Sequence, residues 1–244
     1  MPARQIKLRV AAIVPLLGML VAGAAVAENI AVGNYGSSAN GMPFAVALEK
    51  GYFQQEGANV TGQSCNSTSR VYLHTDIHDA TLPEIVKRVA AIRIGLPTER
   101  DTEMSCLASQ AQFDKTISYI KLGLDGGARL AYGGKRPADP KLTRGFFVEP
   151  TVFADVTDDM RIAREEIFGP VVSILRWSDE SDLISRVNAL DVGLTASIWT
   201  HDLDRAHRLA SRVEAGYVWI NGASTHHVGV PFGGVKQSGL GREE

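Results

Sequence analysis

The 244-residue sequence has few cysteines and no surplus of charge. Its two cysteines, Cys65 and Cys106, permit one disulfide at most, which excludes a disulfide framework. The formal net charge is −2, so there is no basic excess for a phosphate backbone, and we expect no nucleic-acid partner. With 45% hydrophobic and 21% charged residues, the composition is that of a globular protein with a core.

The sequence also lacks histidines at metal-ligand spacing. His74 and His78, and the adjacent His226 and His227, have no third ligand at a spacing typical of zinc sites. Neighbouring residues on a strand point to opposite faces, so the adjacent pair is unsuited to binding one ion. We therefore predict no metal site and interpret these histidines as surface or loop residues. Cys106 is interpreted as a small apolar residue.

The first residues are typical of a secretory signal peptide. Three basic residues precede an apolar run over residues 10–26, which ends in the small-x-small sequence Ala25-Val26-Ala27. An uncleaved membrane anchor is the alternative, because the run is near the lower limit for spanning a bilayer. The sequence favours a signal peptide over residues 1–27 and export to the periplasm.

Residues 28–61 form a short region of different character. We expect a strand over residues 29–33, a small-residue loop, and a helix over residues 43–50 that ends at Gly51. The stretch from Pro43 to Gly57 resembles the beginning of a periplasmic solute-binding protein of the nitrate, sulfonate and taurine type. That resemblance implies an exported binding protein without enzymatic activity, which is the alternative function.

A cysteine follows in the stretch Gly62-Gln63-Ser64-Cys65-Asn66-Ser67-Thr68-Ser69-Arg70, directly before an apolar run at residues 71–73. Small and polar neighbours place the thiol on a turn, where backbone N–H groups favour the thiolate, which is the nucleophilic form. A lone cysteine is more often an inert buried residue, so Cys65 alone does not identify a nucleophile.

Two further blocks follow, Glu165-Glu166-Ile167-Phe168-Gly169-Pro170 and Pro231-Phe232-Gly233-Gly234-Val235-Lys236-Gln237-Ser238-Gly239-Leu240-Gly241-Arg242-Glu243. In this order, the three blocks resemble the aldehyde dehydrogenase superfamily, from its catalytic cysteine onward, over about Gln63 to Glu244. The resemblance implies oxidation of a small aldehyde to a carboxylic acid with NAD or NADP, through a cysteine thiohemiacetal and thioester.

The resemblance also implies roles for individual residues. Cys65 would be the catalytic nucleophile. Glu166 would accept hydrogen bonds from the nicotinamide ribose, a role that suits an acceptor-only carboxylate, and Phe168 would pack beside the nicotinamide. The alternative is that Glu165 and Glu166 are solvated charges before a turn. Arg70 is interpreted as a charge that anchors the turn.

Other correspondences lie farther along the chain. Gln112 and Lys115 match positions with polar contacts to the cofactor, and Phe232 matches an aromatic residue of the substrate tunnel. Residues 223–230 match the variable loop that shapes specificity. The Gly233-Gly234 pair is interpreted as structural, at a place where backbones approach closely.

The alternation of helical and extended patterns from Cys65 onward predicts an α/β fold, a mostly parallel sheet flanked by helices, over residues 62–244. We expect extended segments at 71–74, 128–132, 146–153, 171–177, 196–200 and 217–221, and helices at 82–94, 110–122, 180–189 and 201–215.

The sequence departs from the family before the cysteine. Residues 28–62 contain no match for the dinucleotide-binding domain, for the asparagine of the oxyanion site or for the glutamate that activates water. A join near residues 58–62 is typical of a fusion. We therefore expect an impaired or inactive enzyme, with any homo-oligomer of the family type weakened. The export signal conflicts with the cytoplasmic location that the family implies.

Overall fold

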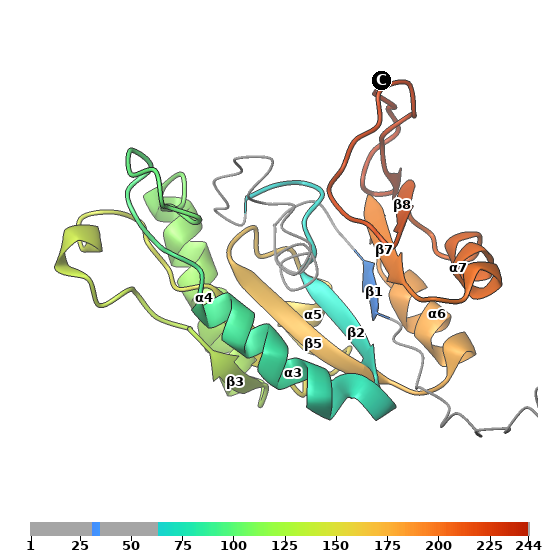
Figure 1. Ribbon diagram of the computed structural model, residues 1–244, viewed down its shortest axis with the longest axis horizontal. Helices are drawn as coiled ribbons and strands as arrows, with labels where there is room; N and C mark the ends of the chain where they lie inside the picture. The colour runs from blue at the N-terminus through green and yellow to red at the C-terminus, as the bar shows by residue number, and fades with distance from the viewer. Residues whose placement is uncertain (1–30, 35–62, 244) are drawn as a thin grey trace, which may run out of the picture.

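The computed structural model describes residues 31–34 and 63–243, and its centre is a seven-stranded sheet (Figure 1). The strand order is β3-β4-β5-β2-β1-β7-β8. These strands are β1 (Ala31–Asn34), β2 (Arg70–His74), β3 (Arg129–Tyr132), β4 (Thr151–Ala154), β5 (Val171–Trp177), β7 (Thr195–Trp199) and β8 (Tyr217–Ile220). A separate two-stranded sheet pairs β6 (Val192–Gly193) with β9 (Val235–Lys236).

Most strands of the large sheet run in one direction. β2 and β4 pair with β5 in parallel, as does β7 with β8. β1 is antiparallel to both β2 and β7, so β2 and β7 share a direction, and only β1 and β3 run the other way. The predicted α/β class is therefore confirmed. We call the edge where β2, β4, β5, β7 and β8 begin the amino edge, and the opposite one the carboxyl edge.

Helices cover both faces of the sheet (Figure 1). They are α3 (Thr75–Ala90), α4 (Gln110–Asp125), α5 (Arg161–Arg164), α6 (Glu180–Asn188) and α7 (Leu203–Ala210), with a 3-10 turn at Pro140–Leu142. Side chains of β5 alternate between two cores: Val172 and Ile174 pack in the one under α3, and Leu175 and Trp177 in the one under α4 and α6. Burial on both faces explains the nearly continuous apolar sequence of β5.

Two helices differ from the expected ranges. α3 begins at Thr75 instead of residue 82, because the His74 side chain accepts a hydrogen bond from the backbone N–H of Asp76 and caps the helix. Pro83 therefore lies inside the helix, which ends at Ala90. α4 continues through Gly123, where a Cβ atom would lie 2.8 Å from Cζ of Phe153. Gly123 thus permits close packing and does not end the helix.

Two further elements are shorter than expected. The helix expected over residues 201–215 is limited to α7, which begins after Asp202, whose side chain accepts from the backbone N–H of Arg205. The extended segment at 146–153 becomes a strand only from Thr151. The strand expected at 29–33 corresponds to β1, and the remaining elements expected within residues 63–243 are confirmed to within a residue or two, while the helix expected at 43–50 lies outside the described residues.

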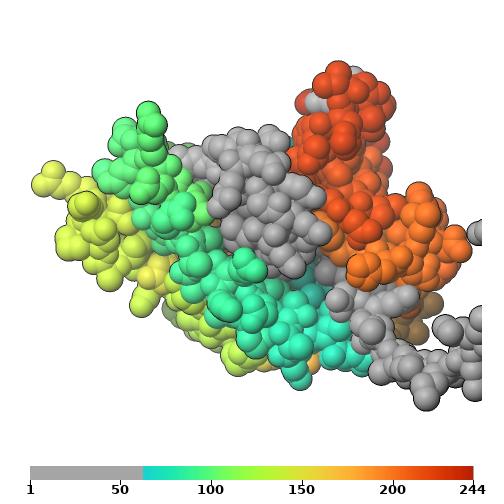
Figure 2. Space-filling model, viewed as in Figure 1, coloured from blue at the N-terminus to red at the C-terminus, as the bar shows by residue number. Residues whose placement is uncertain are grey.

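Residues 221–243 form an arm beside β8, and this arm projects from the body of the molecule (Figure 2). The predicted signal peptide at 1–27 and all of the solute-binding-like segment except β1 lie outside the described residues. Within the described ranges, no helix is long and apolar enough to cross a membrane.

Candidate functional site

Cys65 lies on the turn that leads into β2, and its side chain is exposed. The backbone N–H of Ser67 donates to the Ser64 carbonyl at 3.4 Å and closes the turn. The next two side chains, Asn66 and Ser67, are buried, so the turn is anchored on one side and presents the sulfur on the other. The expectation that this thiol can be reached is confirmed, whereas Cys106 is only half-exposed.

The pairing of β2 with β5 brings the first two sequence blocks to one edge of the sheet. Arg70 at the start of β2 is in register with Ser173 of β5, and the Ser173 N–H donates to the Ser69 carbonyl at 2.9 Å. Cys65 precedes β2, and Glu166 precedes β5 by a similar length of chain. Because the strands are parallel, both residues leave the sheet at the amino edge.

A buried arginine fixes the distance between these two blocks. Nη1 of Arg70 donates to the Ala163 carbonyl of α5 at 2.8 Å, and burial lowers the pKa of the guanidinium to about 10. Ser173 Oγ donates to the neighbouring Ile162 carbonyl at 3.1 Å. α5 leads directly into Glu166, so the turn that carries Cys65 and the Glu166 block are tied together. The interpretation of Arg70 as an anchor is confirmed.

The two glutamates before the turn have different surroundings. Arg161 donates to both carboxylate oxygens of Glu165, at 2.7 and 2.8 Å, and the Tyr119 hydroxyl donates to Oε2 at 2.6 Å. These bonds, first those of Arg161, lower the pKa of Glu165 to about 2. Glu166 is half-buried and has no side-chain partner within residues 63–243. Of the two, Glu166 is therefore the carboxylate that can accept bonds from a ligand.

Phe168 is held in a left-handed backbone conformation with φ +60°. Nε2 of Gln112, in the first turn of α4, donates to the carbonyls of Ile167 and Phe168, each at 2.8 Å. Gly169 packs so closely that a Cβ atom there would lie 2.4 Å from Oγ1 of Thr116. Gln112 and α4 thus fix the shape of this turn, while a direct contact of Gln112 with a cofactor stays a prediction.

Lys115 lies one turn along α4 and is half-buried. Its Nζ atom is 5.8 Å from the ring centre of Tyr119, whose hydroxyl binds Glu165. The structure therefore places Lys115 near Glu165, in the same part of the amino edge as Gln112. A contact between Lys115 and the cofactor stays a prediction.

Phe232 belongs to an aromatic cluster with Tyr217 and Trp219, and only 7% of it is exposed. Its ring centre lies 5.5 Å from that of Tyr217 and 4.2 Å from that of His226. The chain reaches this position by folding back along β8, where Trp219 Nε1 donates to the Thr225 carbonyl at 2.8 Å. The tunnel role of Phe232 is not tested by this arrangement and stays a prediction.

One contact joins this cluster to the nucleophile turn. Nδ2 of Asn66 lies 3.1 Å from Nε2 of His226. His226 is an exposed loop residue, as expected, but its ring and its nitrogen contact two other parts of the site. The sequence analysis did not single out Asn66 or His226 for this site. Their separation of 160 positions leaves no local signal by which one sequence could have paired them.

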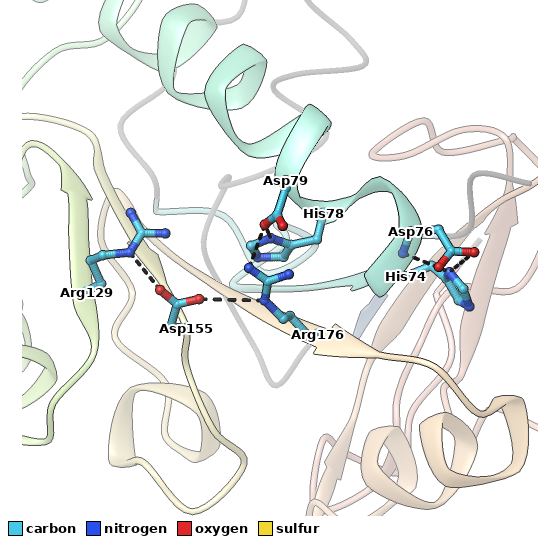
Figure 3. A network of polar contacts seen from close by, with 7 residues as sticks. All are labelled: His74, Asp76, His78, Asp79, Arg129, Asp155 and Arg176. Atoms are coloured by element: carbon cyan, nitrogen blue, oxygen red, sulfur yellow. Dashed lines mark hydrogen bonds and ion pairs between the residues drawn. The ribbon is translucent and has the colours of Figure 1, made fainter. Parts of the chain in front are cut away.

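A second polar cluster lies at the carboxyl edge (Figure 3). Arg129 binds Asp155 at 2.7 Å, Asp155 lies 3.7 Å from Arg176, and Arg176 binds Asp79 at 2.6 Å. Nδ1 of His78 also lies 3.0 Å from Asp79. His78 is fully buried and lies in α3, so its interpretation as a surface or loop residue was wrong. Among the described residues no group of three histidine, cysteine or acidic side chains is arranged to hold a metal ion. This cluster is a chain of ion pairs.

Comparison with known protein families identifies the family to which the chain belongs. Residues 52–244 match the aldehyde dehydrogenase family, and the chain belongs to that family. The match begins before Gln63, where the sequence resemblance was expected to start.

The relatives are substantially longer than the matched region. Aldehyde dehydrogenase tropH of Talaromyces stipitatus is 53% identical over 194 residues, covering 77% of this chain and 38% of that protein. Betaine aldehyde dehydrogenase of Brucella melitensis is 51% identical over 183 residues, covering 75% of this chain and 38% of the relative. The chain thus spans less than half the length of the curated relatives that it matches.

Solved structures give the same fold. HpcC of Thermus thermophilus superposes with a TM-score of 0.76 at 35% identity, covering 86% of this chain and 42% of that one. The NAD+ complex of aldehyde dehydrogenase from Bacillus cereus superposes with a TM-score of 0.74 at 40% identity, covering 85% and 42%.

Proposed function

We propose that the amino edge is the active site of an NAD(P)-dependent aldehyde dehydrogenase, with Cys65 as nucleophile and a small aldehyde as substrate. The observation that carries the proposal is the meeting of three distant segments at one sheet edge. Arg70 and Gln112 hold the Cys65 turn and the Glu166–Phe168 turn, and Asn66 joins the first turn to the loop that precedes Phe232. The named activities of the relatives support the same chemistry.

The residues present fit the reaction of a thiol with a carbonyl group. As thiolate, the exposed Cys65 adds to the aldehyde carbon, and a carbon–sulfur bond forms while the carbonyl oxygen becomes an oxyanion. Backbone N–H groups of the turn are the donors available to stabilise that charge. The carbonyl reforms as that carbon gives up its hydride, for which bound NAD(P)+ would be the acceptor, and Cys65 is left carrying the acyl group as a thioester, which water cleaves to give the acid.

The same edge fits the nicotinamide end of a dinucleotide. Glu166 is half-buried, has no partner in the described part of the chain, and can accept bonds from two ribose hydroxyls. The Phe168 ring is presented by a turn that Gln112 holds in shape, which suits packing against a flat ring. When bound, NAD(P)+ supplies the hydride acceptor. The Bacillus cereus relative, described as an NAD+ complex, supports this cofactor class.

Reduction of NAD+ or NADP+ with a panel of small aldehydes tests the proposal directly. The full chain is compared with Cys65→Ser and, as a matched control, Cys106→Ser. We expect any aldehyde-dependent turnover to disappear in Cys65→Ser and to persist in Cys106→Ser. Turnover that survives in Cys65→Ser would show that the nucleophile has been assigned wrongly.

We also propose that the chain alone turns over slowly or not at all, because residues 28–62 match neither the glutamate that activates water nor the asparagine of the oxyanion site in the family. Losing one oxyanion donor typically costs about 10²–10³ in turnover. Acylation by p-nitrophenyl acetate separates this impairment from a wrong assignment, because the acylation step needs neither the cofactor nor the base that activates water. The thiolate attacks the ester carbonyl and p-nitrophenolate leaves. We expect mass spectrometry to find the acetyl group on Cys65 and not on Cys106.

The segment before residue 62 supports a further proposal, that the chain is exported and its signal peptide removed after Ala27. Sequencing the amino terminus of the protein purified from a bacterial periplasm is expected to give Glu28 first. If export is accompanied by tight binding of a small anion in calorimetry, a binding function without catalysis replaces the enzymatic one.

A further inference from the structure

The two residues that flank Cys65 are bonded to each other across it. Oγ of Ser64 donates to Oδ1 of Asn66 at 2.6 Å. Asn66 is only 8% exposed, so its amide cannot rotate freely into solvent. With Oδ1 accepting from Ser64, the amide presents its NH2 group to the other side.

His226 accepts a hydrogen bond from that NH2 group. An amide nitrogen can only donate, so Nε2 of His226, 3.1 Å from Nδ2 of Asn66, is the acceptor, and the ring proton lies on Nδ1. The same ring packs at 4.2 Å and 30° on Phe232, and at 6.3 Å and 28° on Tyr217. The imidazole is thus held by its face and by one nitrogen at the same time.

We propose that His226 is a positioning residue for Cys65, acting through the Asn66 amide, and that it couples the loop at residues 223–230 to the nucleophile. The inference rests on the proposed function of Cys65. Its physical basis is that the turn itself is closed by a long backbone bond of 3.4 Å, between Ser67 and Ser64. The side-chain bonds of Asn66 therefore supply additional restraint.

Such restraint matters for carbonyl chemistry more than for simple alkylation. Attack on a carbonyl group requires the sulfur to approach along a defined direction while backbone N–H groups face the developing oxyanion. Iodoacetamide needs only an accessible thiolate, because it has no oxyanion to stabilise. The ratio of the two rates at Cys65 therefore reports position separately from access.

Two substitutions separate the hydrogen-bond acceptor of the His226 imidazole from its ring packing. His226→Phe keeps a ring for Phe232 and Tyr217 but removes the acceptor, whereas His226→Gln keeps an acceptor oxygen and removes the ring. His227→Phe is the matched control, because this neighbour is also exposed. Asn66→Ala removes the same bond from the other side, together with the bond from Ser64.

The full chain and each variant are reacted with p-nitrophenyl acetate and, separately, with iodoacetamide, and modification of Cys65 is followed by mass spectrometry. In His226→Phe we expect acylation to slow about tenfold, the scale of one lost hydrogen bond, with alkylation changed less than about twofold. His226→Gln and His227→Phe should stay within about twofold of the parent. Asn66→Ala should slow acylation at least as much as His226→Phe, and the double variant should be no slower than Asn66→Ala.

The possible outcomes distinguish the positioning role of His226 from the proposed function of Cys65. Unchanged acylation in both His226→Phe and Asn66→Ala, or multiplied losses in the double variant, overturns the positioning role while the function of Cys65 stands. Absence of acylation in the parent overturns the proposed function itself. If His226→Phe loosens the fold, alkylation of the half-exposed Cys106 should rise several-fold. In that case the comparison of Asn66→Ala with His226→Gln tests the positioning role instead.

Discussion

The two edges of the central sheet carry polar clusters of opposite kinds. At the carboxyl edge, charged groups such as Arg129, Asp155 and Arg176 bind one another in the open (Figure 3). At the amino edge, Arg70 and Gln112 donate to main-chain carbonyls, and their bonds hold two turns in place. The first cluster neutralises its own charges. The second leaves the thiol of Cys65 exposed, and the half-buried carboxylate of Glu166 without a side-chain partner in the described part of the chain.

This contrast shows why shifted pKa values alone do not locate the site. A bond from Arg176 lowers the pKa of Asp79, and a bond from Arg129 lowers that of Asp155, at the edge without a nucleophile. Ligands of open α/β sheets usually bind at the carboxyl ends of the strands. Here Cys65 and Glu166 precede their strands. Both general rules favour the carboxyl edge, whereas the sequence blocks favour the amino edge, where we propose the active site.

The difference between the edges is sharpest for two arginines. In Arg70→Met the Ala163 carbonyl loses its buried donor, and we expect the free energy of unfolding to fall by about 3 kcal/mol. In Arg176→Met, on the exposed strand end, the loss should be less than about 1 kcal/mol. Urea unfolding measures both.

The same pair of variants tests the link to the site. Acylation of Cys65 should slow in Arg70→Met, because the turn loses its tie to α5, and should not change in Arg176→Met. Equal losses of stability at the two positions would mean that the buried bond and the exposed ion pair are equivalent, and the contrast between the edges would fail.

A second test concerns the backbone beside the aromatic cluster. At Gly216 a Cβ atom would lie 1.8 Å from the carbonyl oxygen of Gly233, and at Gly233 one would lie 2.3 Å from that of Gly241. The interpretation of the Gly233-Gly234 pair as a close approach is therefore confirmed. Gly216→Ala should cost about 2 kcal/mol of stability, because the chain that carries Phe232 must move away.

Gly241→Ala is the matched control, since nothing lies within 4 Å of a Cβ atom there. Thermal unfolding should show a lower midpoint for Gly216→Ala only. A shift of the same size in Gly241→Ala would indicate a general backbone effect instead of a clash.

The sequence predicts the parts of this arrangement that local patterns determine. The apolar run at Val171–Trp177 became β5 without a change of boundary, because burial on both faces demands such a run. The small and polar neighbours of Cys65 correctly indicate an exposed turn. The start of α3 was missed because the helical apolar spacing begins only at Leu82, whereas His74 caps a helix that begins at Thr75, seven residues earlier, and histidine is not a usual N-cap residue.

What local patterns do not contain is pairing over long distances. The bond from Arg70 to Ala163 spans 93 positions, and that from Asn66 to His226 spans 160. Each depends on strand order, which brings segments together only after the sheet has formed. The three sequence blocks could therefore be recognised as a family pattern, while the residues that hold them in place could not.

The smallest expected effect concerns Glu165, the carboxylate of the amino edge that does carry an ion pair. Its pKa is lowered from 4.5 to about 2 by Arg161 and Tyr119, so the stability that it contributes is present above pH 4.5 and is lost as pH falls toward 2. The side chain is 39% exposed, so solvent screens the pair and the contribution is less than about 1 kcal/mol.

Glu165→Gln should therefore be slightly less stable than the parent near neutral pH, and the two should converge as the solution is acidified from pH 4.5 toward pH 2. Urea midpoints measured across that range check this expectation. Glu166→Gln is the control, because its carboxylate has no side-chain partner in the described part of the chain and its replacement should change little. If Glu166→Gln instead shows the larger acid-sensitive loss, then Glu166 supports the fold, and the division between a structural and a ligand-facing glutamate is wrong.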